Sequence, residues 1–254
     1  MHGFLIIKPS KTAIVDGVER ALSDHEQWYV PDASRDFHCS VGVITKDQLK
    51  PGVITIRGAE ILIVPAQFAD RAKSIRRKAQ IITRKDVGAI AGHCGLTKDS
   101  VVVESGAGSG GSTVLFAAIA KHVYAYEIDP ESVALVRENL TRVGLANATV
   151  TCADFYDDGV IPAHEADLVL LDLPEPWRAF SSALRAAALG GYVVAYTPSI
   201  VQAQRFVNGL PKGLLHERTV ETIERSWKIK GDAVRPDTES IGHTAFLTYC
   251  RKVR

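Results

Sequence analysis

Residues 101–111 read VVVESGAGSGG, and this stretch decides the fold. Its valines have the pattern of a buried strand, and a helical stretch begins near Ser112, directly after the glycine-rich run. Glycine has no Cβ, so a backbone rich in glycine can turn sharply and approach a ligand closely. Free N–H groups at the start of a helix attract a carboxylate or a phosphate. The stretch therefore predicts a strand, a ligand-binding turn and a helix.

Strand-like and helical segments alternate around this unit, from about residue 86 to the C-terminus. The expected strands cover residues 101–104, 123–128, 148–152, 167–172 and 192–197. The expected helices cover residues 112–121, 130–143, 176–188 and 201–208. Two last strands, 214–225 and 243–250, have no helix between them, which indicates an antiparallel addition at one edge. The pattern predicts an α/β fold with a Rossmann-like parallel sheet and helices on both faces.

The N-terminal region has a different pattern. Short β-type runs cover residues 3–7, 41–45, 53–56 and 59–64, and turn pairs such as Arg57-Gly58 separate them. One short helical period covers residues 15–22. We expect a small β-rich domain over residues 1–68, a basic linker over 69–85 and the α/β domain over 86–254.

The composition excludes several classes of protein. The chain has 254 residues and a net charge of +1, so a nucleic-acid partner would need a local basic patch. No apolar run is long enough to cross a bilayer, and the first residues lack the features of a signal peptide. The four cysteines form no CxxC pair and have no histidine at metal-ligand spacing. We expect a cytoplasmic protein with no membrane partner, no disulfide scaffold and no metal.

The glycine loop alone fits two cofactors. Gly106, Gly108 and Gly111 match the G-x-G-x-x-G pattern of NAD-binding folds, and spacing does not separate NAD from S-adenosylmethionine. Glu104 would repel a pyrophosphate but would suit the ammonium group of a methionine moiety. Glu127 ends the next strand, 21 residues after Gly106, where it can accept hydrogen bonds from both ribose hydroxyls. These acids favour S-adenosylmethionine.

Two further carboxylates follow strands. Asp154 comes two residues after the third strand and is placed to accept a hydrogen bond from an adenine amino group. Asp172 ends the fourth strand, before a loop that Pro174 and Pro176 restrict. Ligands of open α/β sheets bind at the carboxyl ends of the strands, so we expect Asp172 beside the methyl donor. The alternatives are a tight turn with solvated acids and, for Asp172, a cap on the next helix.

Six stretches resemble the tRNA (adenine-N1)-methyltransferases that modify position 58 of the T-loop, and in archaea also position 57. They are QIIxxKD at residues 80–86, ESGxGSG at 104–110, YE at 126–127, LDLPxPW at 171–177, YxPxxxQ at 196–202 and GHTxFL at 242–247. The resemblance runs from about Asp36 to the C-terminus, and LDLPxPW and GHTxFL are its most specific runs. It implies the class I methyltransferase fold, S-adenosylmethionine as cofactor, tRNA as partner and a homotetramer.

The resemblance also implies roles for single residues. It gives Asp172 a catalytic role, and Tyr196 is a candidate to stack on the target adenine, or else a core tyrosine. The family usually has an aromatic residue or histidine, then proline, before Lys-Asp. This chain has Thr83 and Arg84 there, so a stacking contact is either missing or supplied by Tyr196. The expected cofactor contacts are Gln80, Glu104, Gly106, Gly108, Ser109, Gly110, Glu127, Asp154 and Asp172.

The expected chemistry needs little from the protein. Adenine N1 is a nucleophile once it is freed from base pairing, so the enzyme must extrude the base and aim N1 at the sulfonium methyl group. Our hypothesis is that Asp172 accepts a hydrogen bond from the exocyclic amino group and stabilises the cationic methylated ring.

The densest basic stretch of the chain lies in the expected linker. We expect tRNA phosphates to contact it, although charge runs are usually solvated. The candidate RNA-binding residues are Arg71, Arg76, Arg77, Lys78 and Arg84. Three alternatives stay open: a noncatalytic subunit that only helps to hold RNA, a methyltransferase with a different acceptor, and an NAD-dependent oxidoreductase.

Overall fold

The computed structural model describes residues 3–254 except 16–17, 24, 79, 231–232 and 240. The chain forms two compact units. Unit 1 comprises Met1–Ile75, Arg142–Gly144 and Ile229–Val234, and unit 2 comprises Arg76–Thr141, Leu145–Lys228 and Arg235–Arg254. The expected linker is thus divided between the units, and it contains helix α1 (Phe68–Lys73) and the start of helix α2 (Arg84–Cys94).

Unit 1 is built on an antiparallel sheet with the strand order β4-β1-β8-β7. Its strands are β1 (Phe4–Lys8), β4 (Glu26–Val30), β7 (Gly52–Ile56) and β8 (Ala59–Pro65). Short strands β5 (Phe37–Cys39) and β6 (Gly42–Ile44) pair beside a 3-10 turn, η1 (Lys46–Gln48). Alternate residues of β1 and β8 point inward, and Phe4, Ile6, Ile44, Ile61 and Ile63 form the core.

The expected β-type runs of this region are confirmed, but the expected helix over residues 15–22 is wrong. Strands β2 (Lys11–Val15) and β3 (Val18–Ser23) pair there as an antiparallel hairpin, whose residues 16–17 lie outside the described part. The β7–β8 turn was anticipated, and it uses left-handed backbone at Arg57 and Gly58, with φ of 46° and 75°.

Unit 2 contains a seven-stranded sheet in the order β11-β10-β9-β12-β13-β17-β14. The first five strands in this order are parallel, and β17 is antiparallel to both β13 and β14. The strands are β9 (Val101–Ser105), β10 (His122–Glu127), β11 (Ala148–Cys152), β12 (Ala166–Leu171), β13 (Ala187–Thr197), β14 (Leu214–Glu221) and β17 (Phe246–Lys252). The predicted parallel sheet with an antiparallel edge is confirmed.

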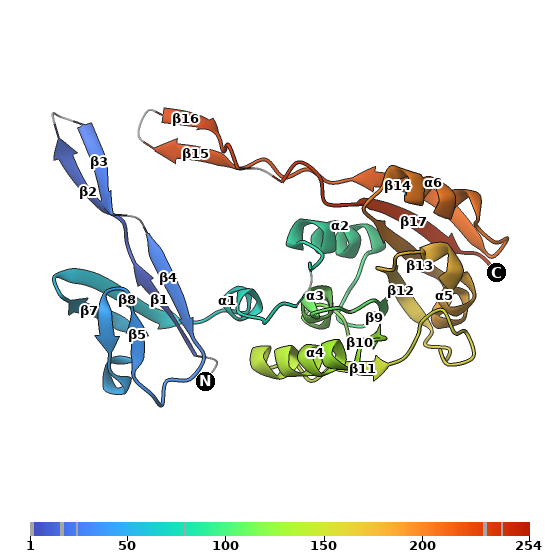
Figure 1. Ribbon diagram of the computed structural model, residues 1–254, viewed down its shortest axis with the longest axis horizontal. Coiled ribbons are helices and arrows are strands. Elements are labelled where there is room, and N and C mark those ends of the chain that lie inside the picture. The colour runs from blue at the N-terminus through green and yellow to red at the C-terminus, as the bar shows by residue number, and fades with distance from the viewer. Residues whose placement is uncertain (1–2, 16–17, 24, 79, 231–232, 240) are drawn as a thin grey trace. The chain divides into compact units, whose positions relative to one another are not determined.

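Helices cover both faces of this sheet (Figure 1). Helices α2, α3 (Gly111–Ala117) and α4 (Pro130–Val143) lie on one face. The 3-10 turn η2 (Pro176–Ala179), α5 (Phe180–Ala186) and α6 (Ile200–Asn208) lie on the other. The chain moves along the sheet from β9 toward β11 in one direction and from β12 toward β13 in the other. Right-handed crossovers therefore place the connecting helices of these two halves on opposite faces. The predicted fold class is confirmed.

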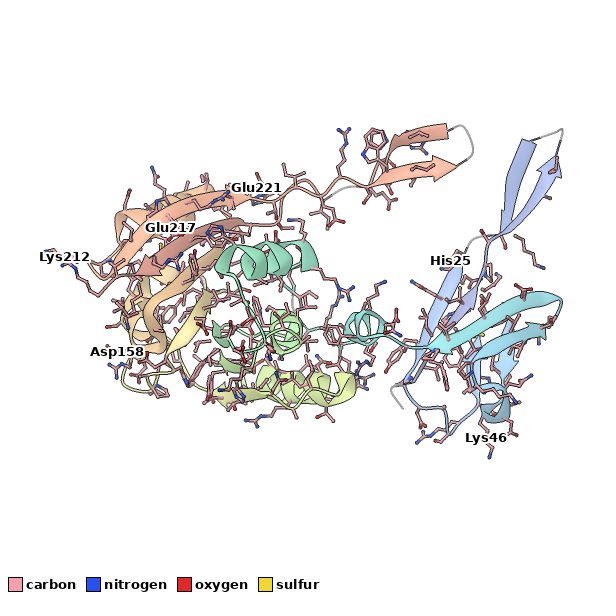
Figure 2. All side chains as sticks on the ribbon, turned by 180° about the vertical axis from the view of Figure 1, so that it is seen from behind. His25, Lys46, Asp158, Lys212, Glu217 and Glu221 are labelled. Carbon is pink, nitrogen blue, oxygen red and sulfur yellow. The ribbon has the colours of Figure 1, made fainter. Side chains whose placement is uncertain are left out.

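Two strands of the C-terminal part were not predicted. Strands β15 (Trp227–Lys230) and β16 (Ala233–Pro236) follow β14 and precede β17 in the sequence, and they pair as a separate two-stranded sheet. The last strand also begins at Phe246 rather than at His243. His243 instead bonds Pro198 O through Nε2 at 2.9 Å and pairs through Nδ1 with Glu221, which Figure 2 labels on β14.

Candidate functional site

The sheet of unit 2 reverses its strand order between β9 and β12. From β9 the chain proceeds outward to β10 and β11, and then returns to β12 on the other side of β9. Such a switch point leaves a crevice at the carboxyl ends of the strands, where open α/β sheets bind ligands. The structure brings four predicted site residues to these ends, namely Glu127, Asp154, Asp172 and Tyr196.

The turn after β9 requires glycine at position 106. Gly106 has a φ of +76°, and its N–H donates to the carbonyl of Tyr126 at 2.9 Å. A Cβ on this residue would lie 2.0 Å from the carbonyl oxygen of Asp172. The backbone of Asp172 is itself tied to β9, since its N–H donates to Ser105 O at 3.1 Å. The glycine turn and the Asp172 loop therefore form one close-packed backbone unit.

Glu127 is held at the same turn by two backbone donors. The N–H of Gly108 donates to its Oε2 at 2.8 Å, and the N–H of Asp129 donates to its Oε1 at 3.0 Å. A Cβ on Gly108 would meet only Gly106 O, at 3.9 Å, so the space beside this glycine is open. The carboxylate is oriented at the strand end before any ligand arrives.

Glu104 lies beneath the loop and is fully buried. The hydroxyls of Ser112 and Thr113, in the first turn of α3, donate to its two carboxylate oxygens, the second at 2.6 Å. Burial raises the pKa of Glu104 to about 7, although these two hydrogen bonds oppose the rise. Glu104 thus joins β9 to the start of α3, and its contact with a ligand ammonium stays a prediction.

Asp172 is the free carboxylate of the crevice. Among the described residues, no donor bonds its side chain, which is partly buried. Burial and the negative charge of Glu127 raise the pKa of Asp172 to about 7. A carboxylate that is withdrawn from water without a donor gains most from an incoming N–H group or cation.

Tyr196 lies at the end of β13 and is bonded to a buried acid. Its hydroxyl donates to Oδ2 of Asp86 at 3.3 Å, and Asp86 is fully buried at the start of α2. Burial and the negative charges of Asp86 and Asp172 raise the pKa of Tyr196, which keeps its hydroxyl protonated. The phenol therefore stands between the site carboxylate and a polar cluster.

That polar cluster was not predicted as part of the site. Lys85 Nζ donates to Asp86 Oδ1, Thr222 O and Thr244 Oγ1, each at 2.7 Å. Thr83 Oγ1 and Thr222 Oγ1 also donate to Asp86, the first at 2.9 Å. Burial raises the pKa of Asp86, but these donors outweigh it and hold the pKa below its ordinary value. Lys85 and Asp86 stood in a quoted motif, but Thr222 and Thr244 lie far away along the chain.

The remaining predicted cofactor residues have different surroundings. Ser109 is buried, and its Oγ accepts from the N–H of Lys78 at 2.9 Å. Gly110 has a φ of +79° and packs on Val136 of α4. Asp154 is exposed after β11 and accepts from the N–H of Tyr156 at 2.9 Å, and Gln80 is exposed before α2. Ligand contacts by these residues stay predictions.

The predicted RNA-binding residues differ in their surroundings. In unit 2, Arg76 forms an ion pair with Glu138 at 3.0 Å, and Lys78 pairs with Asp129 and Glu131 at 2.9 and 2.6 Å. Arg77 is exposed and forms no ion pair within the described ranges, and Arg84 is also exposed. In unit 1, Arg71 donates to the carbonyl of Val143. The acids of α4 thus neutralise part of the basic stretch.

Neither a metal centre nor a membrane segment is found in the described part of the chain. No group of three or more histidine, cysteine, aspartate or glutamate side chains there could hold a metal ion. No helix formed by those residues has the length and apolar character needed to cross a membrane.

Comparison with known structures identifies the same fold. A SAM-dependent O-methyltransferase from Thermotoga maritima superposes with a TM-score of 0.80 at 22% identity, covering 100% of this chain and 94% of that one. The tRNA (m1A58) methyltransferase TrmI from Aquifex aeolicus gives a TM-score of 0.77 at 22% identity, covering 100% and 98%. The acceptors in the names of these two proteins differ, so the fold alone does not identify the acceptor.

Comparison of sequences is more specific. The tRNA (adenine(57)-N(1)/adenine(58)-N(1))-methyltransferase TrmI of Methanocaldococcus jannaschii is 30% identical over 246 residues, covering 85% of this chain and 87% of that protein. The family described as tRNA methyltransferase complex GCD14 subunit matches residues 72–235, which include the glycine turn, Asp172 and Tyr196. The chain belongs to this tRNA methyltransferase family.

Proposed function

We propose that this protein transfers a methyl group from S-adenosylmethionine to N1 of an adenosine in the T-loop of tRNA, at position 58 and also at 57. The relative from Methanocaldococcus jannaschii carries both positions in its name. The observation that supports this most is Asp172, a partly buried carboxylate with a raised pKa and no bonded donor, at the switch point of a methyltransferase sheet.

The residues of the crevice fit S-adenosylmethionine. Glu127 offers an oriented carboxylate to a ribose diol, and the open space at Gly108 lets a ligand approach the backbone. Asp172 suits a cationic neighbour. When bound, this cofactor supplies an electrophilic methyl group. An NAD-dependent oxidoreductase is disfavoured because a pyrophosphate at the glycine turn would lie near the acid Glu104, and because the chain belongs to a tRNA methyltransferase family.

The protein's part in the reaction is orientation and charge stabilisation. Asp172 accepts a hydrogen bond from the exocyclic amino group of the adenine, which fixes the ring so that N1 faces the methyl group. Methylation makes the ring cationic, and the Asp172 carboxylate then stabilises charge that the ground state lacks. Tyr196 stacks against the base, in the role that Thr83 cannot supply.

The decisive experiment locates the methyl group. Unmodified tRNA is incubated with the protein and labelled S-adenosylmethionine, and nuclease fragments are analysed by mass spectrometry. We expect 1-methyladenosine at position 58, with position 57 as the second site. Label at another base, or none, would refute the proposal, and near-wild-type turnover by Asp172→Asn would refute the role of Asp172.

One alternative to this proposal is a noncatalytic subunit of the same family. A noncatalytic subunit would bind tRNA and donor but transfer no methyl group, so the experiment above also tests this alternative.

We infer that the protein is a cytoplasmic homotetramer. Light scattering at micromolar concentration measures the number of subunits directly.

A further inference from the structure

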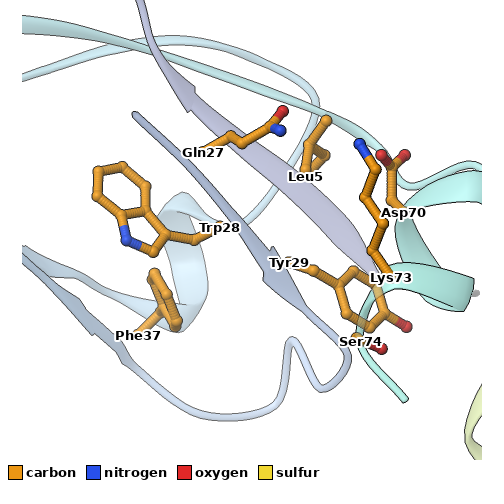
Figure 3. Close-up of a pocket in the computed structure, with 8 residues that line it drawn as sticks. All are labelled: Leu5, Gln27, Trp28, Tyr29, Phe37, Asp70, Lys73 and Ser74. Carbon is orange, nitrogen blue, oxygen red and sulfur yellow. The ribbon is translucent and has the colours of Figure 1, made fainter. Parts of the chain in front are cut away.

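Unit 1 contains a pocket that no part of the methyl-transfer mechanism uses (Figure 3). Its volume is about 440 Å³, within the usual range of roughly 300–1,000 Å³ for small-molecule sites. Strands β1, β4 and β5 and helix α1 line it with Leu5, Gln27, Trp28, Tyr29, Phe37, Asp70, Lys73 and Ser74. We propose that this pocket binds one unpaired nucleotide of the tRNA, with the base on the ring of Tyr29 and the phosphate at Lys73.

The pocket lies at the free edge of the unit 1 sheet. Strand β4 is the first strand of that sheet and pairs only with β1 within it. Tyr29 is the register partner of Leu5, and Gln27 lies two residues from Tyr29, so these three side chains share one face. Trp28 points to the opposite face. The pocket therefore continues around the edge strand and offers ring surfaces from both faces.

The aromatic rings are held in place by packing. Trp28 and Phe37 are half-buried against the core cluster of Phe4, Ile6 and Ile44. Tyr29, on the other face, is half-buried beside α1. Fixed rings with exposed edges and faces are what proteins use to stack unpaired bases. The amide of Gln27 adds both a donor and an acceptor for a base edge.

The charges around the pocket favour an anion. Lys73 is exposed, and in the described part of the chain it forms no ion pair. Burial raises the pKa of Tyr29, while the positive charges of Arg71 and Arg142 oppose the rise, so both cations act on this side of the pocket. Asp70 is the one carboxylate among the lining residues, and its Oδ2 accepts from the N–H of Gln67 at 2.9 Å. Asp70 also acts on Tyr29, so the charges that line the pocket or act on this ring comprise three cations and one acid.

These observations favour a nucleotide over a strand of another protein. A paired strand at β4 would need only the backbone edge and would gain nothing from Lys73, Arg71 or Arg142. A nucleotide uses both the rings and the cations. The proposal rests on the proposed function, because tRNA is the partner that supplies the nucleotide.

The test compares two pocket variants with a charge-matched control in the full-length protein. Tyr29→Leu removes the aromatic face, Lys73→Gln removes the cation, and Lys50→Gln removes an exposed cation of unit 1 that does not line the pocket. Binding of unmodified tRNA transcript is measured between 50 and 200 mM salt, and S-adenosylmethionine binding is measured in parallel. A 4-thiouridine-substituted transcript is crosslinked and the modified peptides are mapped.

We expect Tyr29→Leu and Lys73→Gln each to weaken tRNA binding about 5- to 10-fold. Lys73→Gln should also lower the slope of log affinity against log salt by about one. Lys50→Gln and the donor affinities should not change, and crosslinks should fall within residues 26–30. Because Lys73 is exposed, its variant keeps the test valid if Tyr29→Leu fails to fold.

Unchanged tRNA affinity in Lys73→Gln, or crosslinks confined to unit 2, would overturn the pocket assignment. A changed oligomeric state with unchanged tRNA affinity would also overturn it, in favour of a protein interface at β4. The proposed function fails separately: if wild-type protein binds tRNA in a pocket-dependent manner but forms no 1-methyladenosine, the pocket stands and the methyl-transfer proposal does not.

Discussion

The hydroxyl of Tyr196 donates a 3.3 Å hydrogen bond to the carboxylate of Asp86, 110 residues earlier in the chain. Asp86 is fully buried and itself fixed by Lys85, Thr83 and Thr222. Because the charge of Asp172 also acts on Tyr196, the bond sets the position of an aromatic ring near the Asp172 carboxylate. We therefore treat Asp86 as a positioning residue that acts through Tyr196.

If this is correct, Asp86→Ala and Tyr196→Phe should each lower the single-turnover methylation rate about tenfold, and the double variant should lose little more. Both changes remove the same bond, so their effects should not multiply. Thr83→Val is the matched control, because it removes another donor to Asp86 and leaves Tyr196 untouched. Multiplicative losses in the double variant would show that Asp86 acts independently of Tyr196.

The two glycines of the turn should respond differently to alanine. In Gly106→Ala the new Cβ would lie 2.0 Å from Asp172 O, so backbone must move and donor binding should be lost. We expect a destabilisation of about 1–3 kcal/mol, as for other overpacked sites. Gly108→Ala adds a Cβ in open space and should cost less, mainly through its φ of +54°. Thermal unfolding and calorimetric titration with S-adenosylmethionine measure both effects.

Asp172 should make the protein less stable at alkaline pH. Its pKa rises from 3.8 to about 7 on folding, so between these values the folded state binds more protons than the unfolded state. The free energy of unfolding therefore falls as pH rises through this range. Above the range, Asp172 lowers it by a constant amount. At pH 8 we expect the free energy of unfolding of Asp172→Asn to exceed that of the wild type by about 1–2 kcal/mol after solvent screening.

At pH 4 the same substitution should leave stability almost unchanged. Glu104 also has a pKa of about 7, and the charge of Asp172 contributes to that rise, so the substitution should relieve Glu104 as well and add to the gain at pH 8 but not at pH 4. Denaturant titrations at both pH values measure the effect. An equal stability gain at pH 4 and pH 8 would contradict the linkage argument.

Charge reversal in the basic stretch should have its clearest effect at Arg77. Arg77 forms no ion pair within the described ranges, whereas Arg76 and Lys78 already pair with acids of α4. Arg77→Glu should weaken tRNA binding about tenfold at low salt, and less at high salt, with unchanged donor affinity. Lys121→Glu is the control, because Lys121 is exposed just before the amino-terminal end of β10, at the other end of the strands from the crevice. Equal losses in both variants would indicate a general charge effect.

The sequence was sufficient for the elements that form the core of unit 2. Helix α4 and strand β11 begin and end at the predicted residues, because buried strands and amphipathic helices leave regular apolar patterns. The hairpins were missed for the opposite reason. Ile14 of β2, and Trp227, Ile229 and Val234 of β15 and β16, are exposed, so these apolar side chains do not mark a buried face.

The candidate site was predictable only where it follows strand ends. Glu127 and Asp172 could be placed because the carboxyl ends of parallel strands meet at one edge. The partners of Lys85 could not, since Thr222 and Thr244 lie 137 and 159 residues away and carry no local signal. The replacement of an aromatic residue by Thr83 was visible in the sequence, but its bond to Asp86 was not.

Lys85 bonds both Thr222 and Thr244, and strands β15 and β16 occupy the chain between these two threonines. Lys85 thus holds together the two ends of the segment between Thr222 and Thr244. We expect the sheet and the crevice to tolerate a longer or shorter segment between these threonines, because loop length changes the entropy of loop closure only slightly. We therefore expect a short insertion between β15 and β16 to leave S-adenosylmethionine binding unchanged.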